Sequence, residues 1–577
     1  MIQAKDHSTG LLFDSWDHIG PKRRKLLDRS WAGVFRTFLL HELPIGRIIR
    51  HFKESMGRPS KELYAMTGAM ILQQMFDLSD EETQRALAFN LDWHYALDIT
   101  DESDASTYVS ERTLRNYRRI ILDEHLAPIL FDTFTDRLLK EFGVDVSTQR
   151  LDSTHIQSNM RKLGRVRLFA TTIRKFLRKL SRFHPDVFAG TVSKELADRY
   201  LAKSSDSCFS RVKPSEVSRT LEQVGADLHD LIAGFAAHAA ISTLPEYQML
   251  ERVLREQCTV SGSGADATVA VNPPGTVSPD SLQNPSDPDA GYDAHKGQGY
   301  QAQFMEAYQT GERNPEVPNL ITHVEVEPAD KHDSPALIPA LDATASRKCG
   351  PARVVCDTHY GGDDNLLNAA NKGVDVIAPT AGPAPEGEIT LAHFSVERET
   401  GHITACPEGH APFSMRTTTK NRLVAAFTHK TCRTCPRQKD CPVILEKKAA
   451  YLRYTLPALR CACRRVRENT PEFREAFRWR AGIEGTNSQV KRMTGAGRLR
   501  VRGMESVRLS VTLKALGINI FRCARALAAR LRLAADAFSR FTERFSHRRP
   551  RGVNLSLRIG YLFQILWPFS PYARFVA

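Results

Sequence analysis

The sequence lacks any apolar run that approaches the roughly 20 residues needed to cross a bilayer. Its first residues also lack the basic-then-apolar pattern of a secretory signal. Aromatic residues make up only 8% of the 577 residues, but 42% are hydrophobic and 25% are charged, a globular composition. We therefore expect an ordered cytoplasmic protein, and its length predicts about three or four folded units.

Acidic residues are in short supply. The 66 Asp and Glu residues are outnumbered by 80 Lys and Arg residues, which gives a formal net charge of +14 at pH 7. Unpaired cations are rarely buried, so the excess charge must face solvent or a polyanion. Nucleic acid is the first partner to consider, with a merely basic soluble protein as the alternative.

Cysteines are few, and the 11 that are present do not follow the regular spacing of a secreted disulfide framework. Four of them cluster, because Cys406 is followed by Cys432, Cys435 and Cys441. A Cys-x2-Cys pair with two distant partners suits one tetrahedral Zn2+, with His410 as a substitute ligand. Four closed positions leave none for catalysis, so the predicted zinc is structural. The alternative is a set of reduced thiols on an unrelated loop.

Helical periodicity dominates residues from about Leu26 to His125. Ser79 and Ser110 occupy N-cap positions, and Ser79-Asp-Glu-Glu82 is the pattern of a capping box. The sequence therefore predicts a helical N-terminal domain.

A basic amphipathic helix is predicted from Met160 to Arg182. Its charge includes Arg174, Lys175, Arg178 and Lys179, which we interpret as contacts to DNA. A solvated helix face is the alternative, and the pattern also suits a membrane surface. Residues 259–289, rich in Ser, Gly, Pro and Asp, have the composition of a flexible connector.

Two short strands end in carboxylates. One runs from Val144 to Asp152, and the other is Arg353-Val-Val-Cys356 followed by Asp357. Between and beyond them, alternation predicts strands at 299–304, 320–326 and 374–377, and helices at 334–345 and 365–371. This βαβ pattern indicates a mixed sheet flanked by helices, with Asp152 and Asp357 at one edge.

A third carboxylate, Glu484, lies in a predicted helix with two cations. At about 100° per residue, Phe477, Arg480, Glu484 and Lys491 fall within roughly 60° around the helix axis. Phosphodiester chemistry is served by two Mg2+ ions about 4 Å apart that acidic oxygens hold. Asp152, Asp357 and Glu484 are therefore the candidate ligands of divalent metal ions.

This set of residues resembles the RNase H-like DDE transposases of bacterial insertion sequences. The resemblance is carried by the two strand aspartates and by Arg480-x3-Glu484-x6-Lys491, which is similar to the family's Tyr-x2-Arg-x3-Glu-x6-Lys signature with Phe477 in the tyrosine position. Leu151-Asp-Ser-Thr154, Ser286-Asp-Pro-Asp-Ala290 and Asp357-Thr-His-Tyr360 look like other motifs of the family. The resemblance covers about residues 40 to 525.

The resemblance implies an α/β fold with an RNase H-like catalytic core, an all-helical N-terminal domain and a small zinc-stapled insertion. The expected units begin with a helical DNA-binding or accessory domain at 1–140 and the first part of the core at 141–384. That part of the core is interrupted by a basic helical insertion at 158–258 and by the connector at 259–289. A zinc-binding insertion at 385–450, the second part of the core at 451–530 and a basic tail at 531–577 follow.

The implied activity is metal-dependent cleavage and strand transfer of insertion-sequence ends. Asp152, Asp357 and Glu484 would hold Mg2+ or Mn2+, and Arg480 and Lys491 would contact DNA near the scissile phosphate. The implied partners are double-stranded DNA, both transposon ends and target, and further copies of the chain in a DNA-bound homo-oligomer associated with the nucleoid. The alternatives are an inactive DNA-binding regulator derived from a transposase and an RNase H-like nuclease without strand transfer.

Overall fold

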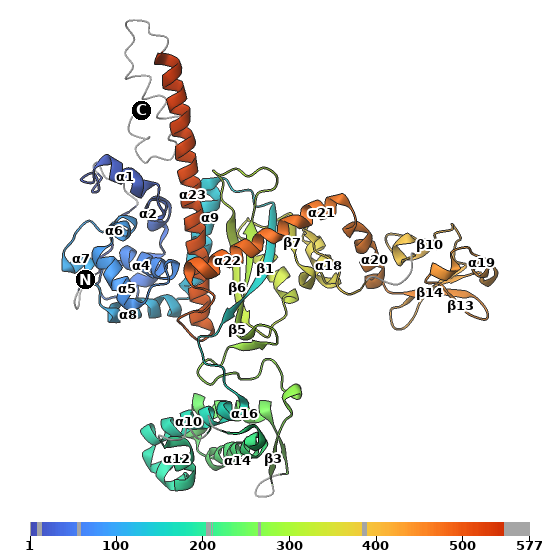
Figure 1. Cartoon of the computed structure of the whole chain (residues 1–577), viewed down its shortest axis with the longest axis horizontal. Coiled ribbons are helices and arrows are strands. Elements are labelled where there is room, and N and C mark those ends of the chain that lie inside the picture. The colour runs from blue at the N-terminus through green and yellow to red at the C-terminus, as the bar shows by residue number, and fades with distance from the viewer. Residues whose placement is uncertain are drawn as a thin grey trace.

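The computed structural model describes residues 2–7, 14–54, 59–202, 209, 212–262, 267–383 and 389–546. Figure 1 shows an elongated molecule in which a central sheet joins a helical N-terminal region, a helical insertion and a distal β-rich unit. Within the described residues, no helix combines the length and the apolar composition that a membrane span requires.

The N-terminal region is helical, as the sequence predicts. Its elements are α1 (Pro21–Asp28), α2 (Trp31–Val34), η1 (Phe35–Leu39), η2 (Leu40–Glu42), α3 (Ile45–Ile49), α4 (Leu63–Met75), α5 (Asp80–Phe89), α6 (Leu91–Leu97), α7 (Asp104–Thr107), α8 (Glu111–Asp123) and α9 (Leu126–Phe142). Ser79 forms the predicted capping box with Glu82, and the Ser110 side chain caps α8.

The long helix α23 (Met504–Ser546) joins the N-terminal region to the sheet. It packs against α4, α9 and strand β6 (Leu320–Pro328), and its buried side chains belong to the same hydrophobic core as those of the N-terminal helices. The predicted basic tail at 531–577 therefore begins as helix, and residues 547–577 lie outside the described residues.

The central sheet is mixed, which is consistent with the expected RNase H-like fold. Strands β6, β5 (Gly297–Ala307) and β1 (Thr148–Gln157) pair antiparallel, and β7 (Arg353–Cys356) and β8 (Asp375–Ile377) follow parallel to β1. The short strand β4 (Gly291–Asp293) extends the outer edge of β5. Helices α17 (Leu337–Ser346) and α18 (Asp363–Asn371) confirm the predicted alternation of strands and helices, with the short turns η6 (Ser334–Ala336) and η7 (Thr358–Tyr360).

Strand β1 differs from its predicted bounds, because it continues for five residues beyond Asp152. Its partner β5 is long and pairs with β1 from Gln149 to Gln157, so backbone hydrogen bonding does not stop at the carboxylate. The parallel pairing with β7 does stop there, at Leu151 opposite Cys356.

The helical insertion after β1 has a hydrophobic core of its own. It contains α10 (Arg165–Phe183), α11 (Pro185–Thr191), α12 (Lys194–Leu201), η3 (Pro214–Glu216), α14 (Val217–Phe235), α15 (Ala239–Ser242) and α16 (Pro245–Gln257). Figure 1 shows it below the sheet as a separate lobe.

The segment expected as a flexible connector is instead largely structured. It forms a hairpin of β2 (Cys258–Ser261) and β3 (Thr268–Val271), followed by η5 (Pro274–Thr276), and residues 263–266 lie outside the described residues. Val269 and Val271 pack on the core of the insertion, and the backbone N–H of the buried Leu282 donates to Glu256 at 2.7 Å. The sequence prediction missed this structure because Ser, Gly and Pro dominate the segment and only a few apolar residues pack against the insertion.

The Ser286-Asp-Pro-Asp-Ala290 motif holds three segments of the fold together through hydrogen bonds. The buried Asp287 carboxylate accepts hydrogen bonds from the Ser158 and Tyr300 hydroxyls, each at 2.5 Å, and from the Gly503 backbone N–H at 3.0 Å. Asp289 accepts from the backbone N–H of Met504 at 2.8 Å. The motif therefore ties the end of β1 and the start of β5 to the beginning of α23.

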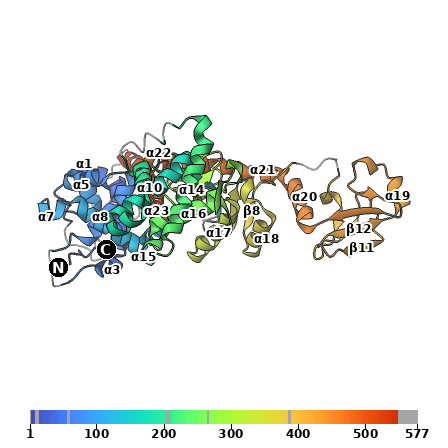
Figure 2. The ribbon, with the colours of Figure 1, turned by 90° about the horizontal axis from the view of Figure 1, so that it is seen from below.

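The distal unit is a small β-rich insertion that projects from one end of the molecule (Figure 2). Its elements are η8 (Leu391–His393), β9 (Ser395–Val396), β10 (Ile403–Ala405), β11 (Ser414–Thr417), β12 (Leu423–Phe427), α19 (His429–Arg433), η9 (Gln438–Asp440), β13 (Ile444–Leu445) and β14 (Ala450–Tyr454). The strand order of its main sheet is β11-β12-β14-β13. The chain then returns to the central sheet through α20 (Leu456–Glu468), α21 (Pro471–Phe477), η10 (Arg478–Ala481) and α22 (Gly482–Thr494).

Candidate active site

Asp152 and Asp357 lie beside each other on neighbouring parallel strands. Leu151 of β1 is in register with Cys356 of β7, so the next residues of the two strands are Asp152 and Asp357. The two side chains are close enough for the charge of Asp357 to raise the pKa of Asp152. The Asp357 carboxylate also accepts a hydrogen bond from the backbone N–H of His359 at 2.8 Å, which begins turn η7.

Glu484 approaches these aspartates from the first turn of α22. Its carboxylate is largely exposed and pairs with Arg480, whose Nη1 lies 2.9 Å from Glu484 Oε1. The other terminal nitrogen of Arg480 lies 3.8 Å from Asp152 Oδ1. Arg480 therefore bridges two of the three predicted acidic residues.

The helix that carries Glu484 is interrupted just before it. The sequence predicted Phe477, Arg480, Glu484 and Lys491 on one continuous helical face, but Phe477 ends α21 and Arg480 lies in the 3-10 turn η10. Gly482 begins α22 close to the sheet, where a Cβ atom would come within 1.8 Å of Arg150 Nη1. As a result, the Arg480 side chain lies beside Asp152 and not on the surface of α22.

Asn487, one turn after Glu484, fastens α22 to β1. Its Nδ2 donates to Asp152 Oδ2 at 3.1 Å and to the Ser153 carbonyl at 3.4 Å. Its buried Oδ1 has no hydrogen-bond partner among the described residues. Residues three apart share a helix face, so the Glu484-x2-Asn487 spacing was a signal for this contact that the sequence reasoning did not use.

Asp333 is a fourth acid near the site, which sequence reasoning also missed. Its carboxylate accepts a hydrogen bond from Gln303 at 3.0 Å, and Gln303 accepts one from the Tyr360 hydroxyl at 2.5 Å. Burial raises the pKa of Tyr360, and the nearby charges of Asp333, Asp152 and Asp357 raise it further. Asp333 stands just before the predicted helix at 334–345, where a polar residue is ordinary, so nothing in the sequence distinguished it.

The electrostatics of the site are dominated by the burial of Asp152. Burial raises the pKa of Asp152 to about 6; Arg480 opposes this shift, whereas the neighbouring charge of Asp357 adds to it. A carboxylate that is desolvated beside another carboxylate binds a proton or a metal cation more readily than an exposed one does.

The donor atoms suit a hard divalent cation. Carboxylate oxygens of Asp152, Asp357 and Glu484 and the unpartnered amide oxygen of Asn487 are of the type that Mg2+ prefers. In the part of the chain that the structure describes, however, no three His, Cys, Asp or Glu side chains are positioned together to hold a metal ion. Arg480 occupies the space between Asp152 and Glu484 and supplies the compensating charge.

A buried ion cluster holds α22 against the sheet behind the acids. Glu306 of β5 is fully buried and pairs with Arg150 at 2.7 Å and with Arg522 of α23 at 2.6 Å. Its other hydrogen bond comes from the Thr486 hydroxyl at 2.7 Å. Despite burial, these partners lower the pKa of Glu306. The cluster joins β1, β5, α22 and α23 and so sets the position of Glu484.

The predicted DNA-contacting cations fall into two groups. Lys491 makes no hydrogen bond or ion pair with any described residue, whereas Arg480 is paired with the acids. On α10, Arg174 is buried and donates to the Tyr200 carbonyl at 3.1 Å, and Lys175 donates to the Pro285 carbonyl.

Farther along α10, Arg178 is exposed, and the Lys179 ammonium lies 4.2 Å from the centre of the exposed Phe183 ring. DNA contact by α10 stays a prediction, and this geometry favours Arg178 and Lys179 over Arg174 and Lys175, whose side chains donate to backbone carbonyls.

The four clustered cysteines gather in the distal unit. Burial raises the pKa of Cys432, and Cys441, Cys406 and Cys435 raise it further, so their sulfur atoms are electrostatic neighbours. Cys406 Sγ accepts a hydrogen bond from the His410 backbone N–H at 3.4 Å, and the His410 side chain is exposed. None of the four forms a disulfide.

Two family models match separate parts of the chain. Residues 405–524 match a transposase DDE domain, and residues 34–119 match a transposase domain. The first match contains Glu484 and the four clustered cysteines but neither Asp152 nor Asp357, and the second covers most of the N-terminal helices. A comparison with curated proteins finds no match.

Proposed function

Because the chain belongs to the DDE transposases of insertion sequences, we propose that it cleaves double-stranded DNA at the ends of its element and joins the freed strands to a target. The observation that carries this proposal is that the fold brings residues of three distant segments to one part of the central sheet. Asp152 and Asp357 stand side by side, and Arg480 links Asp152 to Glu484.

We assign divalent metal binding, by Mg2+ or Mn2+, to Asp152, Asp357 and Glu484. Metal ions bound there would activate the attacking oxygen and stabilise the leaving oxygen of a phosphodiester. The chain's own contributions are distinct. Asn487 orients Asp152, and the cluster around Glu306 positions α22.

The roles of Arg480 and Lys491 separate in this proposal. Arg480 pairs with Asp152 and Glu484 and supplies positive charge beside both carboxylates. A bound metal ion would supply that charge instead and would leave Arg480 available to contact a DNA phosphate. Lys491 lies seven residues after Glu484, or about 10 Å along the helix axis, and its unpaired ammonium contacts the DNA backbone. The match to the Tyr-Arg-Glu-Lys branch is part of the proposal, with Phe477 in place of the tyrosine.

The proposal extends to zinc and to assembly. We assign one structural Zn2+ to Cys406, Cys432, Cys435 and Cys441, because their sulfurs are neighbours and thiolates are zinc ligands. Pairing two transposon ends requires more than one active site, so the DNA-bound form is a homo-oligomer at the nucleoid.

The test is cleavage and strand transfer with a DNA duplex that carries one end of the element. Asp152→Asn, Asp357→Asn and Glu484→Gln should each lose more than about 100-fold in cleavage rate, because removing even a residue that only orients a metal ligand costs about 10- to 100-fold. The matched control is Asp375→Asn, since Asp375 lies on the next parallel strand but is exposed and paired with Arg353 and Arg467.

The outcomes separate the alternatives. Cleavage without joining would indicate an RNase H-like nuclease, and DNA binding by a wild-type protein that never cleaves would indicate a regulator. Near-normal cleavage by any one of the three acid variants would remove that residue from the site.

A further inference from the structure

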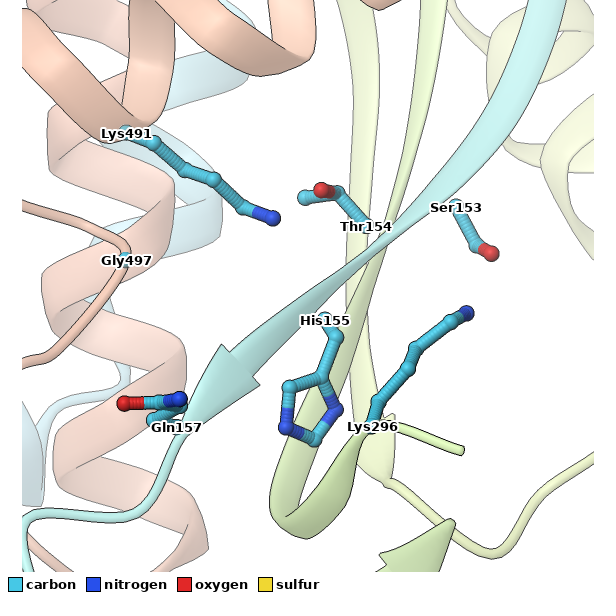
Figure 3. A pocket seen from close by; sticks show the side chains of 7 residues that line it. All are labelled: Ser153, Thr154, His155, Gln157, Lys296, Lys491 and Gly497. Carbon is cyan, nitrogen blue, oxygen red and sulfur yellow. The ribbon is translucent and has the colours of Figure 1, made fainter. Parts of the chain in front are cut away.

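Strand β1 has an open edge immediately after the first catalytic aspartate. Pairing with β7 ends at Leu151, and the same edge meets the chain again only at Gln157, whose backbone N–H donates to the Gly497 carbonyl at 3.1 Å. Between these two points the edge borders a cavity of about 380 Å³, which Figure 3 shows in close-up. The cavity is therefore built into the sheet beside the acidic site.

The charged side chains that line this cavity are all cationic. Lys296 comes from the turn between β4 and β5, Lys491 comes from α22, and the other lining residues are neutral side chains, His155 and Gly497. In Figure 3, Lys491 reaches from α22 toward Thr154 of β1, while His155 projects from β1 on the side of Lys296. Lys162 lies close by, because a Cβ atom on Gly297 would be 3.1 Å from its Nζ.

These cations have no anion of their own. Neither ammonium group, of Lys296 or of Lys491, forms a hydrogen bond or ion pair with a described residue, and the buried Nε2 of His155 is likewise without a partner among them. Burial lowers the pKa of His155 to about 4; Lys296, Lys491 and Lys162 lower it further, and Asp293 opposes them. Three lysines thus surround His155, and Asp293 offsets their charge without forming an ion pair with either lining lysine.

The volume and the position of the cavity indicate which anionic ligand it fits. A cavity of about 380 Å³ lies in the range of small-ligand sites, so it admits a nucleotide unit and not only a phosphate group. Ser153, which lines it, directly follows Asp152. Lys491 is about 10 Å along α22 from Glu484, which corresponds to about three nucleotides at the 3.4 Å rise of one DNA strand.

We propose that this cavity, with Lys296, Lys491 and the donor groups of β1, binds one nucleotide of the DNA strand that leads into the acidic site, and that Lys296 holds its backbone phosphate. This proposal assigns Lys296 and His155 to DNA binding. Both residues are far in the sequence from α22, the helix that carries Glu484. The inference rests on the proposed function, since it takes DNA as the substrate of the neighbouring site.

The test measures binding of a fluorescent 30-base-pair duplex to the full chain in EDTA over a range of salt concentrations. Lys296→Gln should weaken binding several-fold and reduce the slope of log K against log salt by about 0.9, because one phosphate contact is lost. Lys296→Arg should restore the slope. Lys331→Gln is the matched control, because Lys331 is also exposed but pairs with Asp330 at 3.2 Å.

A second measurement is the protection of lysines from acetylation by the same duplex. Lys296 and Lys491 should be protected, and Lys331 should not. An unchanged salt slope in Lys296→Gln, or full acetylation of Lys296 in the complex, would overturn the proposal. Equal protection of Lys296 by millimolar deoxynucleoside monophosphate would also overturn it, by assigning the cavity to free nucleotides.

Failure of the cavity proposal and failure of the proposed function give different results. Because EDTA removes the metals, the binding test does not depend on cleavage. If the wild-type protein cleaves DNA while Lys296→Gln keeps the wild-type slope, only the cavity proposal fails. If Lys296→Gln reduces the slope but no wild-type cleavage is found, only the catalytic proposal fails.

Discussion

Two clusters of charge lie two residues apart on strand β1, and they are balanced very differently. Around Arg150, the buried Glu306 has two arginines and a threonine hydroxyl as partners, and its pKa is lowered. Around Asp152, Arg480 pairs with two acids, Asp152 and Glu484, and the pKa of Asp152 is raised to about 6. The balanced cluster joins four elements of the fold, whereas the unbalanced one is the cation site that we propose.

The distal cysteines extend this comparison, since they are a second group of potential metal ligands in one unit, and burial raises the pKa of Cys432, which keeps its thiol neutral without metal. If such groups are cation sites, each chain should contain about one Zn2+. Cys432→Ser with Cys435→Ser should remove the metal and unfold the distal unit, because binding energy at structural zinc, roughly 10 kcal/mol or more in zinc-finger peptides, is folding energy. Elemental analysis and limited proteolysis check this. A zinc-free wild-type protein with an intact distal unit would contradict it.

The balanced cluster should respond to substitution by losing stability. Glu306→Gln leaves Arg150 and Arg522 buried without their carboxylate, so we expect a loss of about 3–5 kcal/mol in urea unfolding. Glu325→Gln is the control on the adjacent strand, where one half-exposed pair with Arg508 at 3.4 Å should contribute less than about 1 kcal/mol. Equal effects of the two substitutions would show that burial of the cluster does not matter.

Substitution in the unbalanced cluster should have the opposite effect and increase the stability of the metal-free protein. Because the pKa of Asp152 is raised from 3.8 to about 6, the folded protein retains a proton that the unfolded chain loses, and the associated stability disappears as pH rises through about 6. In metal-free protein, Asp152→Asn should therefore be more stable than wild type above about pH 6, by on the order of 1–3 kcal/mol. The difference should vanish near pH 4. Urea unfolding in EDTA across this pH range measures it, and a pH-independent difference would refute the explanation.

The same distinction applies, with smaller effects, to the basic helix α10. Arg178→Gln with Lys179→Gln should reduce the salt slope of DNA binding by about 2, because each lost phosphate contact lowers it by about 0.9. Arg174→Gln with Lys175→Gln should leave the slope unchanged and lower the melting temperature, since both cations donate to carbonyls inside the protein. Slopes that fall equally in both double variants would show that burial does not separate the two pairs.

The sequence predicted elements better than it predicted contacts. Alternation and helical periodicity are local properties, so strands β5 to β8, the capping box at Ser79 and the presence of a helix at Glu484 followed from them. The contacts of Arg480 did not follow, because they depend on the 3-10 turn and on the close approach of Gly482 to Arg150.

Charge in the sequence likewise did not reveal its partners. Arg174 and Lys491 are both cations on predicted helices, and the sequence does not distinguish them. In the structure, Arg174 donates to a backbone carbonyl inside the helical insertion, whereas Lys491 lines a cavity. Lys296 went unnoticed because it lies in a turn, and only the pairing of β4 and β5 brings it beside β1. Such long-range pairings are decided by tertiary structure, which no local pattern encodes.

The central claim is that the unbalanced acids Asp152 and Asp357 bind divalent metal. It is tested most directly by titrating purified protein with Mn2+ and following the free ion by electron paramagnetic resonance. Wild type and Glu325→Gln should bind Mn2+ equally, and Asp152→Asn with Asp357→Asn should abolish that binding without unfolding the chain. Unchanged Mn2+ binding by the folded double variant would contradict the assignment of Asp152 and Asp357 as metal ligands.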